Sequence, residues 1–132
     1  MTDTSEIEKE YLSSLSDLNV NSKPLISMLT MLAEENIEHG QVIVDVIVKH
    51  ITKIHPDVKL PVLYLIDSIV KNLGSQYDNR YITLFSNSIV NVFCDVFQEV
   101  NEKVRAKMFA LRQTWNDVFP QAKLVRIGRQ NQ

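Results

Sequence analysis

The chain has 132 residues, a formal net charge of −2 and an isoelectric point of about 5.9. This length suits a single domain with its own apolar core, and the acidic balance argues against a protein that binds by neutralising many phosphates of nucleic acid or anionic lipid. No apolar run is long enough to cross a membrane, the first residues lack the pattern of a secretory signal, and the single cysteine, Cys94, is expected to be buried in a protein of a reducing compartment.

The first third of the chain predicts two amphipathic helices that pack as an antiparallel pair. The first covers residues 6–18, and the second starts at Pro24, since Asn21 and Ser22 are good capping residues and proline suits a first helical turn. We expect the second helix to end near residues 35–38. The predicted apolar faces are Ile7, Tyr11, Leu12, Leu15 and Leu18 in the first helix, and Leu25, Met28, Leu29, Leu32 and Ala33 in the second.

Residues 42–54 carry two competing signals. Their β-branched residues alternate well enough for a strand, yet Ile43, Ile47, Ile51 and Ile54 also fit one face of a helix. We predict a helix, because no other segment offers a strand partner and a lone strand would leave its backbone unpaired.

Residues 58–74 predict a helix that is apolar over most of its circumference and therefore lies in the middle of the domain. Pro61 suits its first turn, and Gly74 suits its C-terminal cap. Its buried stripe is predicted to contain Val62, Leu63, Leu65, Ile66, Ile69, Val70 and Leu73. The arc left open to solvent or to a ligand carries Tyr64, Asp67, Ser68 and Lys71, bordered by Asn72.

The last third predicts two further long helical patterns. Apolar residues recur at helical spacing over residues 81–100, with a bend near residues 86–88. Asn101 is then predicted to cap a helix over residues 102–118, which Pro120 ends. Its predicted apolar face contains Val104, Met108, Leu111, Trp115 and Val118, while Arg105, Phe109, Arg112 and Asn116 project from its flank.

The tail predicts a short helix near Leu124 and is otherwise linker-like, so we expect one domain over residues 1–120 and a C-terminal extension over residues 121–132. Seven or eight helices without strands predict an all-α domain of stacked helix pairs. The sequence has no internal repeat of fixed period, which leaves a superhelical stack and a globular bundle both open.

The sequence offers little for catalysis or metal binding. The three histidines stand neither four residues apart nor beside the cysteine, no glycine-rich phosphate loop is present, and Ser68 lacks the setting of a nucleophile elbow. We therefore predict no enzyme, no metal and no cofactor. The polar arc of the central helix favours a peptide-binding groove, in which Lys71 and Arg112 could attract an anionic ligand; an ordinary polar helix edge is the alternative.

Four stretches carry a family resemblance. NSKPLISMLTMLAEEN (21–36), LPVLYLIDSIVKNLG (60–74), VNEKVRAKMFALRQTW (100–115) and NDVFP (116–120) resemble the CTD-interacting domain of the Pcf-type subunit of the pre-mRNA cleavage and polyadenylation machinery. The resemblance implies a right-handed superhelix related to VHS, ENTH and armadillo-type stacks. It also implies a nuclear, monomeric domain that binds the YSPTSPS repeats of the largest RNA polymerase II subunit, usually when phosphorylated, and couples transcription to mRNA 3′-end processing and termination.

The resemblance further implies which residues bind the peptide. The groove is expected between the helices at residues 22–36, 59–73 and 102–118. The aspartate of the motif, Asp67, is expected to accept the hydrogen bond of the repeat tyrosine, beside Ser68 and Ile69. Asn72 is a further groove residue. Asn21, Ser22 and Lys23 open the second helix at the rim, and Asp67→Ala is expected to abolish binding with the fold intact.

One departure from the family pattern concerns phosphate recognition. Several related domains carry an arginine shortly after the tryptophan of the seventh helix, where this chain has Asn116, Asp117 and Val118. We therefore expect only a diffuse basic contribution, from Arg112 first, with a modest and salt-sensitive preference for phosphopeptides. The residues behind Arg112 in this role are Lys71, Lys23 and Arg105.

The sequence leaves two other functions open. A VHS- or ENTH-like trafficking adaptor would bind sorting peptides or lipid, but its lipid form needs a basic surface, and the N-terminus here is acidic. Direct RNA binding is expected to be weak at most, and no membrane binding is expected. Other cleavage-factor subunits are expected to bind regions outside this chain.

Overall fold

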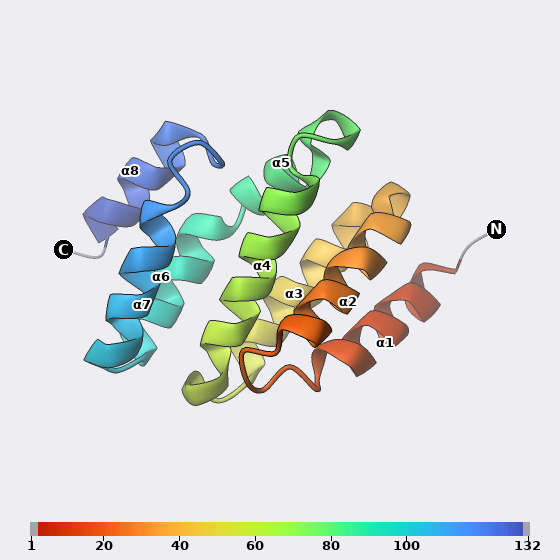
Figure 1. Cartoon of the computed structure of the whole chain (residues 1–132), viewed down its shortest axis with the longest axis horizontal. Helices are drawn as coiled ribbons and strands as arrows, with labels where there is room; N and C mark the ends of the chain where they lie inside the picture. Colours follow the sequence, from red (N-terminus) through yellow and green to blue (C-terminus); the bar gives the residue numbers. More distant parts are fainter. Residues whose placement is uncertain (1–2, 131–132) are drawn as a thin grey trace.

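The computed structural model describes residues 3–130, within which the chain forms eight α-helices, three 3₁₀ helices and no strand (Figure 1). The α-helices are α1 (Thr4–Leu15), α2 (Lys23–Glu35), α3 (Gly40–Lys53), α4 (Lys59–Leu73), α5 (Arg80–Ser86), α6 (Ile89–Glu99), α7 (Glu102–Gln113) and α8 (Gln121–Gln130). The 3₁₀ helices are Ile37–His39, Pro56–Val58 and Tyr77–Asn79. The all-α prediction is confirmed, including a helix where residues 42–54 alternate like a strand.

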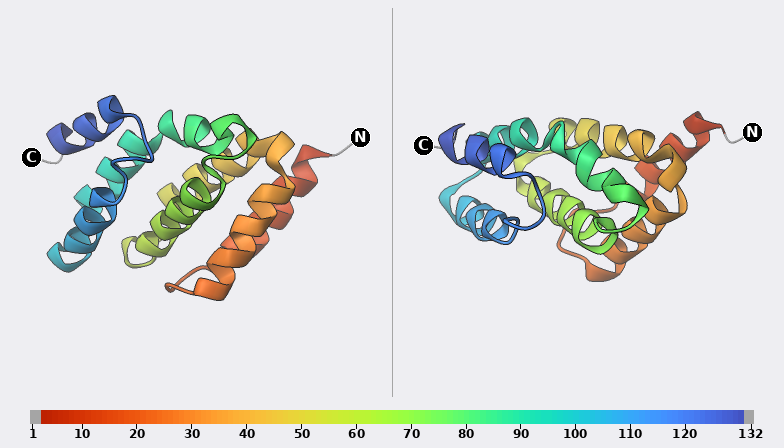
Figure 2. Two further views of the ribbon diagram at one scale, coloured as in Figure 1. Left: turned by 45° about the horizontal axis from the view of Figure 1, so that its top comes forward. Right: turned by 90° about the horizontal axis from the view of Figure 1, so that it is seen from above.

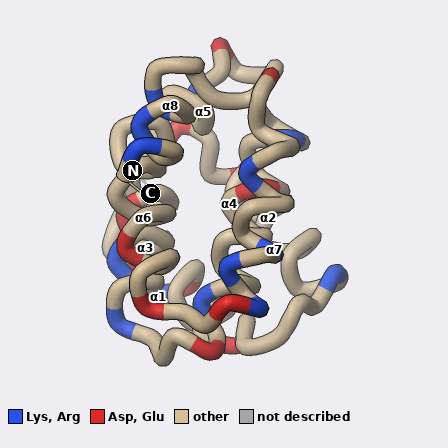
Figure 3. Tube along the Cα trace, turned by 90° about the vertical axis from the view of Figure 1, so that its left-hand side faces the viewer, with Lys and Arg blue, Asp and Glu red and all other residues tan. Residues whose placement is uncertain are grey.

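The helices lie in two layers. Helices α2, α4 and α7 run side by side in one layer, and α1, α3, α6 and α8 lie behind them (Figures 1, 2 and 3). Within its layer α4 lies between α2 and α7, so α4 has neighbours on both flanks as well as behind it. This position explains why α4 carries apolar residues on most of its sides.

The central helix buries the predicted stripe. Val62, Ile66 and Ile69 are fully buried, and Pro61 occupies the first turn. Gly74 follows the helix in ordinary right-handed helical conformation, so a positive φ does not explain the glycine. A Cβ at residue 74 would instead collide with the main-chain carbonyl oxygen of Val70 and lie 2.7 Å from Cδ1 of Ile82, so the end of α4 has no room for a side chain at this position.

Two buried tyrosines fix the position of α2. The Tyr11 hydroxyl donates a hydrogen bond to the Leu29 carbonyl at 3.1 Å, and the Tyr81 hydroxyl donates to the Ala33 carbonyl. Both acceptors lie on α2, one turn apart, while the donors come from α1 and α5. Helix α2 is thus held at a fixed rotation against the second layer.

Two predicted core positions, one on α1 and one on α2, are wrong. Leu12 and Met28 are both exposed, whereas Ile26 and Thr30 are buried on α2. The apolar residues of α1 and α2 outnumber the positions that the neighbouring helices can cover, so periodicity alone assigned too wide a face to each helix. Cys94 is buried, as expected.

The C-terminal boundaries also differ from the prediction. Helix α7 ends at Gln113, because the chain then passes into tight turns in which the amides of Thr114 and Trp115 bond to carbonyls three residues back. The tail is not linker-like: α8 continues to Gln130, and Leu124 and Ile127 are buried against the rest of the fold. Pro120 begins α8 rather than ending α7, since its carbonyl accepts the first amide bonds of the new helix.

We predict that Tyr11→Phe and Tyr81→Phe each lower the free energy of unfolding by about 1 kcal/mol at neutral pH, because each leaves a buried bond unmade. Burial raises the pKa of both hydroxyls well above their ordinary value. The unfolded chain therefore releases these protons above a pH of about 10 while the folded chain keeps them, so stability is full below that pH and falls above it. Urea titrations at several alkaline pH values should show a shallower fall in each variant; a fall as steep as in the parent would contradict the assignment.

Candidate peptide-binding site

A cleft of about 320 Å³ lies between α2 and α4. Five of its seven lining residues are polar, and they come from the middle and end of α2 and from the second half of α4, which run side by side (Figure 1). The residues that line it are Ser27, Thr30, Met31, Glu34, Ser68, Asn72 and Leu73. Two of the predicted site residues, Ser68 and Asn72, therefore share one cleft, which we call the α2–α4 cleft.

A hydrogen-bonded chain of side chains forms the floor of the α2–α4 cleft. The Thr30 hydroxyl donates to the Ile26 carbonyl at 2.8 Å, so in its 2.8 Å contact with Ser68 the serine hydroxyl is the donor. The Asn72 amide nitrogen donates to the Ser68 carbonyl at 2.8 Å and to Ser68 Oγ at 3.2 Å. These bonds use the side-chain amide hydrogens of Asn72 and leave its side-chain oxygen, Oδ1, as an acceptor for a ligand.

Asp67 lies on the other flank of α4, where α4 meets the end of α7. Its Oδ1 accepts a hydrogen bond from the indole Nε1–H of Trp115 at 2.8 Å and an ion pair from Lys71 Nζ at 2.7 Å. Lys71 Nζ also donates to Thr114 Oγ1 at 2.7 Å. This group of residues, which we call the Asp67 junction, ties α4 to α7.

The second carboxylate oxygen of Asp67 is the available acceptor at this junction. Oδ2 has no hydrogen-bond partner among residues 3–130, and the side chain is 19% exposed. The carboxylate is held by two donors on one oxygen, so its orientation is fixed before any ligand arrives. A partly buried carboxylate with one open oxygen is suited to accept a hydroxyl proton from a ligand.

The other predicted residues of α4 divide between surface and core. Tyr64 is half-buried one turn before Asp67 and packs against the core. Ile69 is fully buried, so its side chain cannot contact a ligand, and its place in the family motif reflects packing. The prediction that Ile69 lines the surface site is therefore wrong at the level of the side chain.

The start of α2 lies apart from the middle of the cleft. Ser22 caps the helix, its Oγ accepting from the Leu25 amide at 3.3 Å, and Asn21 and Lys23 beside it are exposed. Seven residues of helix separate Lys23 from Thr30, about 10 Å along the axis. The structure therefore brings these three residues to one end of the α2 surface, where only an extended ligand reaches both places.

Arg112 and Lys71 do not lie at the same site. It lies on the flank of α7 that faces α6 and α8, where it donates to Asn116 Oδ1 at 3.0 Å and lines a pocket with Phe97, Phe109 and Ile127. Arg105 lies on the same flank, with its guanidinium over the Phe97 ring. The predicted basic contribution from Arg112 and Arg105 is thus separated from the Asp67 junction.

Sequence reasoning missed three residues that build the site. Trp115 was assigned only to an apolar face, Thr30 was not singled out, and Thr114 was taken as part of a continuing helix. The signal that could have found Trp115 is its indole N–H, which needs an acceptor when the ring is buried. Among the residues of the open arc, Asp67 is the strongest such acceptor.

Residues 3–130 contain no group of three or more His, Cys, Asp or Glu side chains placed to hold a metal ion. None of the helices described here combines the length and hydrophobicity of a bilayer-spanning segment.

Two helical layers with a cleft along one of them give the fold of a helical stack. The family model described as CID domain matches residues 8–127, and the chain belongs to this family. The match extends into α8 and favours the CTD-interacting domain over the trafficking-adaptor alternative.

Relatives and a solved structure agree with this membership. The chain is 39% identical over 113 residues to Protein PCF11 of Saccharomyces cerevisiae and 35% identical over 121 residues to Polyadenylation and cleavage factor homolog 11 of Caenorhabditis elegans. These matches cover 86% and 90% of this chain but only 17% and 14% of the two relatives. A structure titled crystal structure of the rpr of pcf11 superimposes with a TM-score of 0.85 at 34% identity, covering 92% of this chain and 95% of that one.

The Asp67 junction predicts a specific stability pattern. Asp67→Ala should lower the free energy of unfolding by about 1–3 kcal/mol, because the buried Trp115 N–H loses its acceptor. Asp67→Asn should cost less, since an amide oxygen can still accept that bond. Urea titrations followed by tryptophan fluorescence would measure both; equal losses for the two variants would contradict the role of Asp67 as acceptor.

Proposed function

We propose that this domain binds the YSPTSPS repeats of the RNA polymerase II C-terminal domain across the face formed by α2, α4 and α7. The observation that carries the proposal is the open Oδ2 of Asp67, an oriented and partly buried acceptor on the flank of α4 opposite the α2–α4 cleft. Membership of the CID domain family supports the choice of peptide.

The repeat tyrosine is the anchor of the proposed complex. Its ring packs beside the apolar surface of α4 while its hydroxyl donates to Asp67 Oδ2, so the polar end of the side chain remains satisfied when buried. Since the acceptor is ionised, this bond is stronger than one between neutral groups. The anchor therefore requires both the ring and the hydroxyl of tyrosine.

The α2–α4 cleft receives the serine, threonine and main-chain groups of the repeat. The Asn72 carbonyl oxygen offers an acceptor for a main-chain amide or a hydroxyl, since the amide hydrogens of Asn72 are already engaged by Ser68. Proline favours a turn within each repeat, which compacts the peptide enough to fit a short cleft. Asn21 and Lys23 contact the peptide only where it extends toward the start of α2.

Binding of a single repeat is expected to be weak, in the micromolar to tens of micromolar range, because a flexible peptide loses conformational entropy on docking to a small surface. Repetition compensates for this weakness, since neighbouring repeats raise the effective concentration. A weak site on a repetitive ligand also releases readily.

The biological role follows from the same proposal. The chain acts in the nucleus as a non-enzymatic interaction domain that recruits a pre-mRNA cleavage and polyadenylation factor to transcribing polymerase. The name of the Caenorhabditis elegans relative, Polyadenylation and cleavage factor homolog 11, supports this assignment. Contacts with other processing subunits are assigned to regions outside this domain, since the chain spans only 14–17% of the length of these two relatives.

Asp67→Asn should weaken binding of a fluorescent two-repeat peptide by about tenfold or more, because the charged acceptor of the tyrosine hydroxyl is lost. Asp45→Asn is the matched control, since Asp45 is exposed on α3 and bonds only to Gln41 among residues 3–130. Fluorescence anisotropy measures both affinities, and circular dichroism checks that both variants are folded. An unchanged affinity for the Asp67 variant would remove Asp67 from the site.

Phosphate on the second-position serines should strengthen binding only modestly, and the gain should disappear at high salt. Lys71 is already paired with Asp67 and Thr114, and Arg112 lies on the far flank of α7, so only solvated charges such as Lys23 attract the phosphate. Anisotropy titrations of both peptides at two salt concentrations test this. A phosphate preference that persists at high salt would contradict the absence of a direct phosphate contact.

A further inference from the structure

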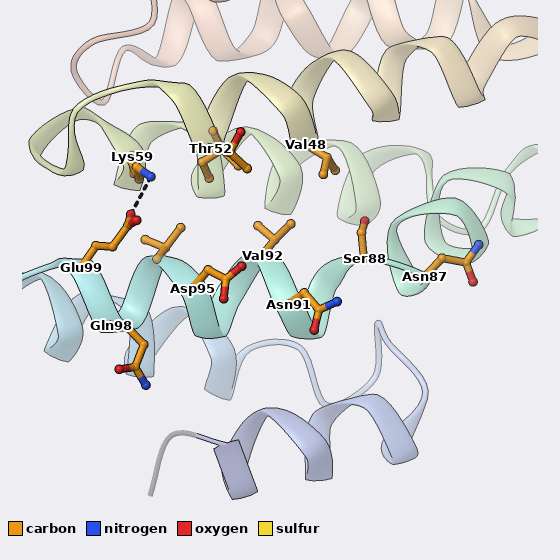
Figure 4. A pocket seen from close by; sticks show the side chains of 12 residues that line it. Val48, Thr52, Lys59, Asn87, Ser88, Asn91, Val92, Asp95, Gln98 and Glu99 are labelled. Carbon is orange, nitrogen blue, oxygen red and sulfur yellow. Dashed lines mark hydrogen bonds and ion pairs between the residues drawn. The ribbon is translucent and has the colours of Figure 1, made fainter.

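A second groove, of about 450 Å³, lies between α3 and α6 in the other layer of the molecule (Figure 4). Its apolar floor contains Ile51, Val92 and Val96, which the structure buries. Figure 4 shows the Lys59–Glu99 pair at one end of the groove and Asn87 and Ser88 at the other. None of its lining residues belongs to the α2–α4 cleft or to the Asp67 junction.

One rim of the groove is a regular polar row. Asn91, Asp95 and Glu99 follow one another on α6 at intervals of four residues, so they project from the same side of the helix. Four helical residues span about 6 Å, and two residues of an extended chain span about 6.6 Å. The spacing of alternate residues in an extended peptide therefore nearly matches the spacing of the side chains in this row.

The row also offers unused hydrogen-bonding groups. Neither the amide of Asn91 nor the carboxylate of Asp95 has a partner among residues 3–130, and Figure 4 shows both side chains on α6 at the edge of the groove. An asparagine amide both donates and accepts, as the main chain of a peptide does.

Lys59 supplies a buried charge at the end of the row. Its side chain is only 4% exposed, and its ammonium donates to Glu99 at 2.6 Å. No other hydrogen-bond partner of this ammonium occurs within residues 3–130, although an ammonium has three donors. The remaining donors are suited to a carbonyl oxygen supplied by a ligand, because burial makes an unmet donor costly.

The charged residues of the groove determine which kind of ligand it favours. Lys59 is neutralised by Glu99, which leaves the carboxylate of Asp95 in excess. A polyanion such as nucleic acid or an anionic lipid surface would be repelled, whereas a basic side chain would find its counter-ion. The apolar floor meanwhile accommodates the aliphatic stem of a lysine or arginine.

We propose that the α3–α6 groove binds an extended peptide segment of another protein, with one basic side chain paired to Asp95 and a main-chain carbonyl bonded to Lys59. Asn91 holds the main chain between these two contacts. The domain thus has two peptide-binding faces in separate layers, and this second site does not depend on the proposed heptad-repeat site.

The test uses mixtures of acetylated, amidated octapeptides in which one position is fixed as arginine, glutamate or leucine. Backbone amide shifts of the isotope-labelled protein are followed during titration with each mixture. The arginine mixture should shift signals of α3 and α6 and bind about fivefold more tightly than the glutamate mixture. A saturating heptad-repeat peptide should leave these shifts unchanged, which separates this site from the α2, α4 and α7 face.

Charge reversal at the rim gives the decisive control. Asp95 is exposed on a helix, so Asp95→Lys is expected to fold, and it should reverse the preference toward the glutamate mixture. Asp45→Asn, in the same layer but outside the groove, should keep the preference for arginine. The proposal is overturned if no mixture shifts α3 and α6 at millimolar concentration, if arginine and glutamate bind equally, or if Asp95→Lys retains the original preference.

Discussion

The hydrogen bond from the Trp115 indole to the Asp67 carboxylate is the contact on which the binding face depends. Trp115 is fully buried, packed edge-on against Phe93 and Phe119, so its N–H has to find a partner inside the fold. Asp67 provides that partner from the neighbouring helix. One interaction thus joins α4 to the end of α7 and fixes the orientation of the carboxylate that we propose as the acceptor for the ligand.

This double role gives a physical reason for the composition of α4. The helix must bury apolar residues on most sides because it lies between α2 and α7 and in front of the second layer (Figure 3). Three of its remaining polar residues are constrained by neighbours: Ser68 by Thr30, Asn72 by Ser68, and Lys71 by Asp67 and Thr114. A surface whose polar groups are already oriented loses little entropy when a peptide docks.

The two layers give the molecule two chemically different surfaces. The α2, α4 and α7 face presents an oriented carboxylate and a short polar cleft, which suits a ligand rich in hydroxyl groups. The α3–α6 groove presents a polar row above an apolar floor with one carboxylate in excess, which suits a basic extended segment. Because the layers are separate, a single small domain has room for both ligands at once.

The sequence predicted the helices whose burial is settled by periodicity, and α4 above all, because an apolar stripe with a proline start leaves few alternatives. It failed where tertiary contacts decide: the end of α7 at Gln113, the packing of α8, and the exposure of Leu12 and Met28. In the candidate site, the open arc of α4 was predicted from helical spacing, and its role in peptide binding was predicted from the family motif. The hydrogen bond from Trp115 to Asp67 and the position of Arg112 were not predicted. No local sequence pattern indicates which side chains of α7 and of the turns after it face α4.

The most direct test of the central claim compares two-repeat peptides containing tyrosine or phenylalanine, titrated against the parent protein and Asp67→Asn. If the tyrosine hydroxyl donates to Asp67, the parent should prefer the tyrosine peptide by about tenfold, and the variant should bind both peptides with similar affinity. The same tyrosine preference in both proteins would show that the hydroxyl bonds elsewhere, and would contradict the account.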